Sequence, residues 1–184
     1  MKIAVYSGSF NPLHIGHQAI MEYLTEHSDF DWVYLVVSPQ NPFKDASCNL
    51  TARDRYEAAI EAVKRHPELR VWVDDIELAM EPPQYTIRTL DALREREPGN
   101  EFTLVIGGDN LESIRKWKDY ERILTEYGVV VYPRKGTDLA ALREDLLREG
   151  PYRITLIDSP MVDISSTEIR EGLARGEDMS QYMM

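Results

Sequence analysis

Short runs of β-branched and aromatic residues alternate along the chain with segments whose apolar residues recur every three or four positions. The runs cover residues 3–6, 32–37, 71–73, 102–106, 129–132 and 154–157. Each is short and apolar enough to be a buried strand. The segments between them show helical spacing around residues 15–23, 56–63, 87–93, 114–124 and 139–146, which predicts amphipathic helices.

This alternation predicts an α/β protein. No two of the runs are joined by a two-residue hairpin turn, so right-handed βαβ crossovers and a parallel sheet are favoured. We predict a Rossmann-like, doubly wound parallel sheet of about six strands with helices on both faces. No Gly/Ser linker, repeat or low-complexity tract divides the sequence, so residues 1–184 are expected to form a single domain.

The loops after the predicted strands are the places to search for chemistry, because ligands of such sheets bind beyond the carboxyl ends of the strands. The first of these loops contains neither the dinucleotide fingerprint nor the P-loop pattern. It offers instead a Gly8-Ser9 turn and two histidines, His14 and His17, at the start of a predicted helix. Two imidazoles near a helix N-terminus suit an anion. Ordinary surface or core histidines remain an alternative, whereas a zinc pair would need a further ligand that the neighbouring sequence lacks.

The charge of the chain limits its partners. The 184 residues include 21 Lys and Arg against 32 Asp and Glu, for a formal net charge of -11. A protein that holds a long polyanion needs many cations, so nucleic acid is not expected as a partner. Residues 1–21, 32–44 and 128–137 nevertheless contain no carboxylate, and an anionic ligand could be accommodated there.

Targeting signals and cysteines indicate the compartment. No apolar run approaches the roughly 20 residues that cross a bilayer, and the first ten residues do not form a signal peptide. The single cysteine, Cys48, cannot make an internal disulfide or a multi-cysteine zinc site, which favours a reducing environment. We therefore expect a cytoplasmic protein without membrane contact.

Two separated motifs carry a resemblance to a known family. Residues 8–17, with the sequence GSFNPLHIGH, resemble the (T/H)xGH signature of the nucleotidyltransferase superfamily of Rossmann-like proteins, and residues 164–170, ISSTEIR, resemble its second signature, ISSTxIR. Together, in this order, they are far more specific than either alone. The loops at residues 39–44, 85–90, 107–111 and 133–134, together with Trp117, look like those of nicotinate (or nicotinamide) mononucleotide adenylyltransferases. The resemblance covers essentially the whole chain.

The resemblance implies adenylyl transfer from ATP to a pyridine mononucleotide in NAD biosynthesis, with Mg²⁺ carried on the substrate phosphates and no metal ligands from the protein. It implies catalytic contacts to phosphate by His14, His17, Lys44 and Arg170. It implies ATP contacts by Gly8, Ser9, Phe10, Gly107, Asp109, Ser165, Ser166 and Thr167. Mononucleotide contacts are implied for Asn11, Thr86, Trp117 and Arg134. Backbone N–H groups near Thr86 would favour nicotinate over nicotinamide.

Several of these residues also have simpler interpretations. Ser165 with Glu168 three positions later is a capping box that opens a short helix, and this is compatible with phosphate binding. Trp117 also fits a core position in its periodic segment. Lys44, Arg134 and Lys135 also fit ordinary solvated charge.

The first motif departs from the family at two positions. The family commonly has Gly and Asp where this chain has Ser7 and Asn11. The missing carboxylate leaves the role of Asn11 open, although an amide still hydrogen-bonds a ribose or a phosphate.

Other functions remain open at this point. Pantetheine-phosphate adenylyltransferase shares both signatures, but residues 85–90 and 107–117 fit it less well. A non-catalytic nucleotide sensor is a second alternative, although the intact His14, His17 and Arg170 speak against it. Kinship to aminoacyl-tRNA synthetases conflicts with the small size and acidic charge. Nothing in the sequence fixes the oligomeric state.

Overall fold

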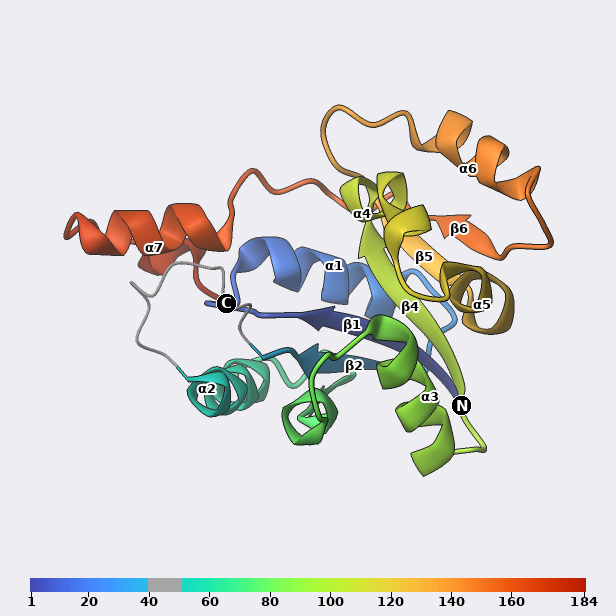
Figure 1. The fold of residues 1–184 in the computed structure, drawn as a ribbon. Helices are drawn as coiled ribbons and strands as arrows, with labels where there is room; N and C mark the ends of the chain where they lie inside the picture. The colour runs from blue at the N-terminus through green and yellow to red at the C-terminus, as the bar shows by residue number, and fades with distance from the viewer. Residues whose placement is uncertain (40–50) are drawn as a thin grey trace.

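A six-stranded sheet forms the centre of the computed structural model, which describes residues 1–39 and 51–184. The strands are β1 (Lys2–Gly8), β2 (Trp32–Val37), β3 (Val71–Asp74), β4 (Glu101–Gly107), β5 (Val129–Tyr132) and β6 (Ile154–Leu156). All neighbours pair in parallel, in the order β3-β2-β1-β4-β5-β6 (Figure 1). All six predicted strands are confirmed, with no end shifted by more than two residues. Residues 40–50, which include Lys44 and Cys48, lie outside the described part.

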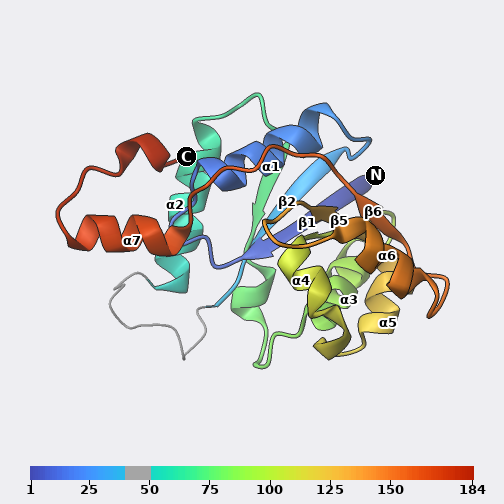
Figure 2. The same ribbon diagram turned by 90° about the horizontal axis from the view of Figure 1, so that it is seen from above.

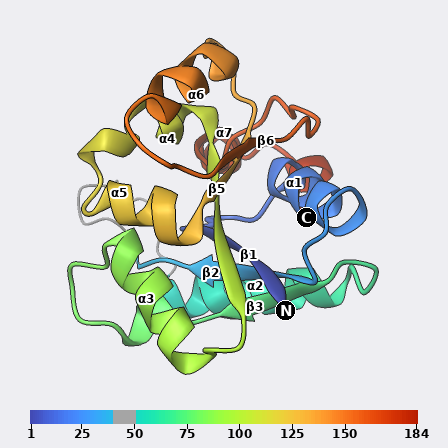
Figure 3. The same ribbon diagram turned by 90° about the vertical axis from the view of Figure 1, so that its right-hand side faces the viewer.

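Helices cover both faces of the sheet, as predicted. They are α1 (Ile15–Glu26), α2 (Ala52–Lys64), α3 (Thr86–Arg96), α4 (Gly108–Glu112), α5 (Tyr120–Arg122), α6 (Leu139–Leu147) and α7 (Ser166–Ala174). Short turns η1 (Ile76–Ala79), η2 (Ile114–Lys116), η3 (Ile123–Tyr127) and η4 (Ser180–Tyr182) complete the described elements. Figures 2 and 3 show α1 and α2 on one side of the sheet and α3 to α6 on the other. Among the described helices, none combines the length and the apolar character needed to cross a membrane.

The sheet separates two hydrophobic cores. Alternate residues of a strand point to opposite faces, so Ile3 and Val5 enter the core under α3 to α6, whereas Ala4 and Tyr6 enter the core under α1 and α2. Strands buried on both faces explain why the sequence shows continuous apolar runs rather than polar and apolar alternation.

The predicted helix over residues 114–124 is wrong. The chain makes the 3-10 turn η2, passes through Trp117 in an extended conformation, and reaches Asp119 in the left-handed region with φ 52°. It then continues as α5 and the π-helical turn η3. The apolar spacing marked buried positions correctly, since Ile114 and Leu124 are fully buried. The helix is interrupted because the chain turns at Asp119, a residue type that tolerates this conformation better than most.

The strand order places the functional end of the sheet. From β1 the chain moves outward through β2 and β3, and from β4 it moves outward in the opposite direction through β5 and β6. The order therefore reverses between β1 and β4, and a crevice is expected at their carboxyl ends. The loop that contains His14 and His17 follows β1, and Asp109 follows β4.

Candidate active site

Two neighbouring cavities lie at the carboxyl ends of the strands. The larger has a volume of about 570 Å³ and is lined by the loops after β1, β5 and β6 and by the start of α7. The smaller has a volume of about 140 Å³ and is lined by the ends of β1 and β4, by Thr86 and by Trp117. Tyr6 and Tyr132 line both cavities. A molecule that occupies both would therefore pass over these two rings.

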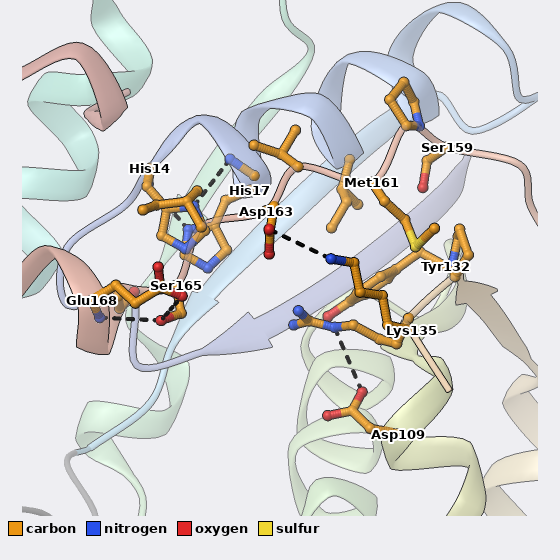
Figure 4. A pocket seen from close by; sticks show the side chains of 18 of the residues that line it. His14, His17, Asp109, Tyr132, Lys135, Ser159, Met161, Asp163, Ser165 and Glu168 are labelled. Carbon is orange, nitrogen blue, oxygen red and sulfur yellow. Dashed lines mark hydrogen bonds and ion pairs between the residues drawn. The ribbon is translucent and has the colours of Figure 1, made fainter. Parts of the chain in front are cut away.

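His14 and His17 stand side by side at the amino-terminal end of α1. His14 is the N-cap residue, and its Nδ1 accepts the N–H of Gly16 at 3.0 Å. The Nδ1 of His17 accepts the N–H of His14 at 3.1 Å, and the rings stack with centroids 3.7 Å apart. Because each Nδ1 accepts a hydrogen bond, a neutral ring carries its proton on Nε2. Both rings line the larger cavity (Figure 4), so the pair supplies two Nε2–H donors beside a helix N-terminus.

The surroundings keep both imidazoles neutral. Burial, reinforced by the positive charge of Arg134, lowers the pKa of His14 to about 4. Burial lowers the pKa of His17 well below its ordinary value, and the neighbouring His14 and Arg134 add to the effect. At neutral pH the pair therefore offers hydrogen-bond donors rather than fixed charges to an anion.

The start of α7 forms another wall of the larger cavity. Ser165 is its N-cap: the hydroxyl accepts the N–H of Glu168 at 3.1 Å and lies 3.1 Å from the Glu168 carboxylate, to which it donates. The predicted cap of Ser165 on the Glu168 N–H is thus confirmed. In a full capping box the Glu168 carboxylate would also accept the backbone N–H of Ser165, but here it accepts the Ser165 hydroxyl instead.

Polar bonds tie α7 to the loop after β1, although Figure 1 shows this helix set apart from the sheet. Arg170 donates to the carbonyl of Asn11 at 2.6 Å and to the Thr167 hydroxyl at 3.2 Å. Ser166 donates to the carbonyl of Pro12 at 2.9 Å. The two family motifs, more than 150 residues apart in the sequence, are therefore in direct contact.

Two further cations line the larger cavity from the loop after β5. Arg134 lies 3.7 Å from Asp109, and Lys135 lies 3.4 Å from Asp163. All four side chains are at least half exposed, and such ion pairs contribute little stability. In Figure 4 Lys135 and Asp109 lie across the cavity from His14 and His17. Both cations can therefore exchange a carboxylate for a phosphate at low cost.

The smaller cavity contrasts with this because none of the described residues that line it is charged. Its lining consists of Tyr6, Ser7, Gly8, Ser38, Thr86, Leu104, Val105, Ile106, Asn110, Trp117 and Tyr132. Thr86 is the first residue of α3, and no side chain of its N-cap, Tyr85, caps the helix. The first N–H groups of a helix have no partner inside the helix, so this end of the cavity favours a negatively charged group.

The structure brings most of the predicted site residues together. The larger cavity is lined by Ser9, His14, His17, Asp109, Arg134, Ser165, Ser166, Thr167 and Arg170. The smaller is lined by Gly8, Thr86 and Trp117. Arg134, predicted to contact the mononucleotide, lines the larger cavity, and Gly8, predicted to contact ATP, lines the smaller.

Three predicted residues line neither cavity. Phe10 is buried, with its ring edge-on against Tyr6 and His17 at centroid distances of 5.3 and 5.0 Å. Asn11 is buried, and its carbonyl holds Arg170. A Cβ at Gly107 would lie 2.9 Å from the Tyr132 ring. These residues act on the site by supporting the groups that line it.

Sequence reasoning missed Tyr6, Tyr132 and Ser38. Both tyrosines end apolar runs and were interpreted as strand core, which is also true, since both are buried. The available signal was their position: each lies within the last residues of a strand next to the point where the order reverses. Ser38 directly follows β2, in a loop that the sequence had already marked for chemistry.

The described residues offer few ligands for a metal ion. Across residues 1–39 and 51–184, no three His, Cys, Asp or Glu side chains gather into a metal site. The larger cavity does contain the exposed carboxylates Asp109 and Asp163. Mg²⁺ prefers oxygen ligands and, with nucleotides, takes most of them from phosphate and water. The donor set fits a Mg²⁺ carried in on the phosphates.

Comparison with known proteins adds the family. The cytidylyltransferase-like family model matches residues 5–172. A probable nicotinate-nucleotide adenylyltransferase of Flavobacterium psychrophilum is 42% identical over 173 residues, covering 94% of this chain and 86% of that protein. A probable nicotinate-nucleotide adenylyltransferase of Bacteroides fragilis is 39% identical over 182 residues, covering 99% of this chain and 87% of that protein. The solved structure of a Plasmodium falciparum nicotinic acid mononucleotide adenylyltransferase complexed with NaAD has a TM-score of 0.78 at 20% identity, covering 99% and 90%, and shares the fold.

A doubly wound sheet with a cavity lined by histidines and cations at its switch point, matched by this family model over residues 5–172, defines a nucleotidyltransferase of the cytidylyltransferase-like class. Within that class, the chain belongs to the nicotinate-nucleotide adenylyltransferase family. The resemblance found in the sequence is confirmed.

Proposed function

We propose that this chain transfers the adenylyl group of ATP to nicotinate mononucleotide, giving the dinucleotide and pyrophosphate in NAD biosynthesis. The observation that carries the proposal is the pair of adjoining cavities, one lined by cations and N–H donors and one neutral with a tryptophan. Nicotinamide mononucleotide would be a second acceptor. Residues 1–184 would act as one domain, in the cytoplasm.

The reaction needs positioning rather than a general base. The 5′-phosphate of the mononucleotide, already an anion, attacks the α-phosphorus of ATP in line, and the bond from that phosphorus to the bridging oxygen breaks as pyrophosphate leaves. Catalysis then consists of holding two anions that repel each other and stabilising charge on the transferred and leaving phosphates. Donors and cations suit this work.

The larger cavity would take ATP. The Nε2–H donors of His14 and His17 would contact the triphosphate, with His17 nearest the α-phosphoryl. Arg170 would bind the triphosphate from α7, aided by the hydroxyls and first N–H groups of that helix, contributed by Ser165, Ser166 and Thr167. Arginine forms strong charge-assisted bonds to phosphate. Lys44 would add a further cation from the loop after β2.

The nucleosides would lie against the strand ends. Asp109 would accept from a ribose hydroxyl, and Ser9 would approach the adenylate through its backbone. Arg134 lies over the Tyr132 ring, 5.4 Å from its centroid, and that ring borders both cavities. We therefore assign Arg134 to the phosphates where the two substrates meet.

The smaller cavity would take the pyridine ring. Trp117 would stack on it, and Thr86 would place the start of α3 beside its carboxylate. An uncapped helix N-terminus stabilises a carboxylate more than a neutral amide, so nicotinate is the favoured acceptor.

Mg²⁺ would be the cofactor. Bound to phosphate oxygens, it would neutralise charge on the leaving pyrophosphate. Asp163, which lines the larger cavity, would accept hydrogen bonds from the water ligands of Mg²⁺.

Pyrophosphate release with ATP and Mg²⁺ tests the proposal. Nicotinate mononucleotide, nicotinamide mononucleotide and 4′-phosphopantetheine are compared at matched concentrations, with a no-acceptor control. We expect release with both pyridine mononucleotides and faster release with nicotinate. Release with phosphopantetheine alone would reassign the acceptor site, and no release with any acceptor would make the chain a nucleotide sensor.

A further inference from the structure

Glu77 is a buried carboxylate that the proposed reaction does not use. It lies on η1, directly after β3, and is 5% exposed. Its Oε2 accepts the hydroxyl of Ser7 at 3.2 Å and that of Thr89 at 3.1 Å, and it also receives the hydroxyl of Ser38. Within the described ranges, no Lys, Arg or His forms an ion pair with it. A buried carboxylate without a counter-charge is costly, and most are paired.

Two of these hydroxyls connect Glu77 to the smaller cavity. Ser7 and Ser38 line that cavity, and their oxygens lie 3.1 Å apart. Ser7 and Ser38 each have one proton, and both donate it to Glu77. Both serine protons therefore point toward Glu77. The cavity wall presents the lone pairs of the oxygens, with a negative charge directly behind them.

This charge acts on a cavity whose described lining residues are all uncharged. In a poorly solvated site, a single charge one side chain away is weakly screened. The pyridine mononucleotide proposed to occupy this cavity carries a positive charge on its ring. The ring nitrogen of a pyridine mononucleotide is bonded to the ribose, so the ring is a permanent cation.

We propose that Glu77 is the counter-charge for the pyridinium ring, and that through Ser7 and Ser38 it makes the smaller cavity select a cationic pyridine over a neutral one. This inference rests on the proposed function, since it assumes that a pyridine mononucleotide enters that cavity. It also gives Ser7 a role where the family commonly has glycine: the hydroxyl links the carboxylate to the cavity wall. Burial raises the pKa of Glu77 while the three hydroxyls oppose the rise, and a cation in the cavity stabilises its ionised form.

Binding of two forms of one ligand tests this. Nicotinamide mononucleotide and its 1,4-dihydro form have the same amide, ribose and phosphate, but only the oxidised ring is charged. Their dissociation constants are measured by titration calorimetry on the wild-type protein and on Glu77→Gln, which keeps the shape and removes the charge. We expect the wild type to prefer the oxidised form, and Glu77→Gln to reduce that preference by about tenfold. The loss should come from weaker binding of the oxidised form, with the reduced form changing less than about twofold.

A matched variant separates charge from packing. Thr89→Ser keeps the hydroxyl that bonds the same carboxylate from α3 and removes only a methyl group outside the cavity lining, so the charge and its hydrogen bonds stay in place. Its preference should equal that of the wild type. Trp117 also favours a cationic ring, but it is present in every variant, so the change in preference reports Glu77 alone.

The outcomes are distinct. Equal affinity of the wild type for both forms overturns the inference without any variant, as does a Glu77→Gln protein that loses both ligands equally. If the wild type still releases pyrophosphate with nicotinate mononucleotide in these cases, only the inference fails. If it neither binds nor uses any pyridine mononucleotide, the proposed function fails and the inference with it.

Discussion

The two cavities lie at the same edge of one sheet, yet they are built in opposite ways. The larger is lined by loops and helix starts, carries Arg134, Lys135 and Arg170, and contains ion pairs that are mostly exposed. Among the described residues, the smaller is lined by strand ends and neutral side chains, and the buried carboxylate of Glu77 lies behind Ser7. The larger cavity attracts anions, whereas in the smaller one Glu77 attracts a cation and the start of α3 at Thr86 attracts a carboxylate. A pyridine mononucleotide carries both, a phosphate and a pyridinium ring, so the difference would orient it.

The residues of the two cavities also differ in how much they contribute to the stability of the fold. Exposed cations at loops can be removed with little effect on folding. Groups of the smaller cavity continue into the core, as Trp117 packs against the cluster under α3 to α6. Substitutions on the larger side should therefore change turnover more than melting, and substitutions on the smaller side should change both.

The largest effect is expected for His17→Ala. Removing a preorganised donor to the transferred phosphoryl should lower kcat by about a hundredfold or more. The melting temperature should fall by only a few degrees, because the lost Nδ1 contact is a helix-cap bond worth about 1 kcal/mol. Pyrophosphate release and thermal denaturation measure the two quantities.

The matched control for His17 is His27→Ala. His27 follows the other end of α1 and is exposed, so its removal should leave turnover at the wild-type value. An unchanged kcat in His17→Ala would remove this residue from the mechanism. A melting temperature that collapses would make it a structural residue.

Trp117→Ala should have a smaller effect, on the KM for the mononucleotide rather than on kcat. Loss of stacking should raise the KM for the mononucleotide by about tenfold, while the KM for ATP stays within about twofold. Because Trp117 also packs on the core, some loss of thermal stability should accompany the change. Steady-state kinetics with each substrate varied in turn gives the comparison.

Trp72→Ala is the control for loss of a tryptophan. Trp72 lies on the edge strand β3 and is 58% exposed, so both KM values should be unchanged. Equal loss of affinity for both substrates in Trp117→Ala would contradict a separate pyridine cavity and favour the core interpretation of this residue.

The sequence could predict features that depend on local patterns, namely the buried strands and the residues of short motifs. The strands were predictable because a strand buried on both faces must be continuously apolar, and His14, His17 and Arg170 were predictable because short motifs hold them. The helix over residues 114–124 was wrong because apolar spacing reports burial but not the backbone reversal at Asp119.

The proposed role of Glu77 could not be predicted because it depends on hydrogen-bond partners that lie far from it in the sequence. Ser7 lies 70 residues before it and Thr89 lies 12 residues after it, and only the parallel pairing of β1, β2 and β3 brings them together. Tyr6 and Tyr132 likewise become neighbours of both cavities only through the strand order. Motif residues are visible in a sequence, whereas residues that act through the fold are not.

The smallest expected effect is a pH dependence of the protein's stability, caused by His14 and His17 of the larger cavity. An unfolded histidine binds its proton near pH 6.5, whereas burial and Arg134 hold the pKa of folded His14 at about 4 and that of His17 well below its ordinary value. Between these values the unfolded chain binds more protons than the folded one. Stability is therefore complete above about pH 6.5 and is lost as the pH falls toward 4.

His14→Asn isolates this dependence, since asparagine caps a helix well and does not titrate. Melting temperatures measured from about pH 7 to about pH 5 should fall less steeply in the variant than in the wild type, by a few degrees over the interval. The same substitution at His27, exposed at the other end of α1, should leave the wild-type slope unchanged. Parallel curves for His14→Asn and the wild type would mean that folding does not shift the pKa of His14. The ring would then gain its positive charge below about pH 6.5, and the difference between a donor pair at α1 and cations at the loop after β5 would disappear in that range.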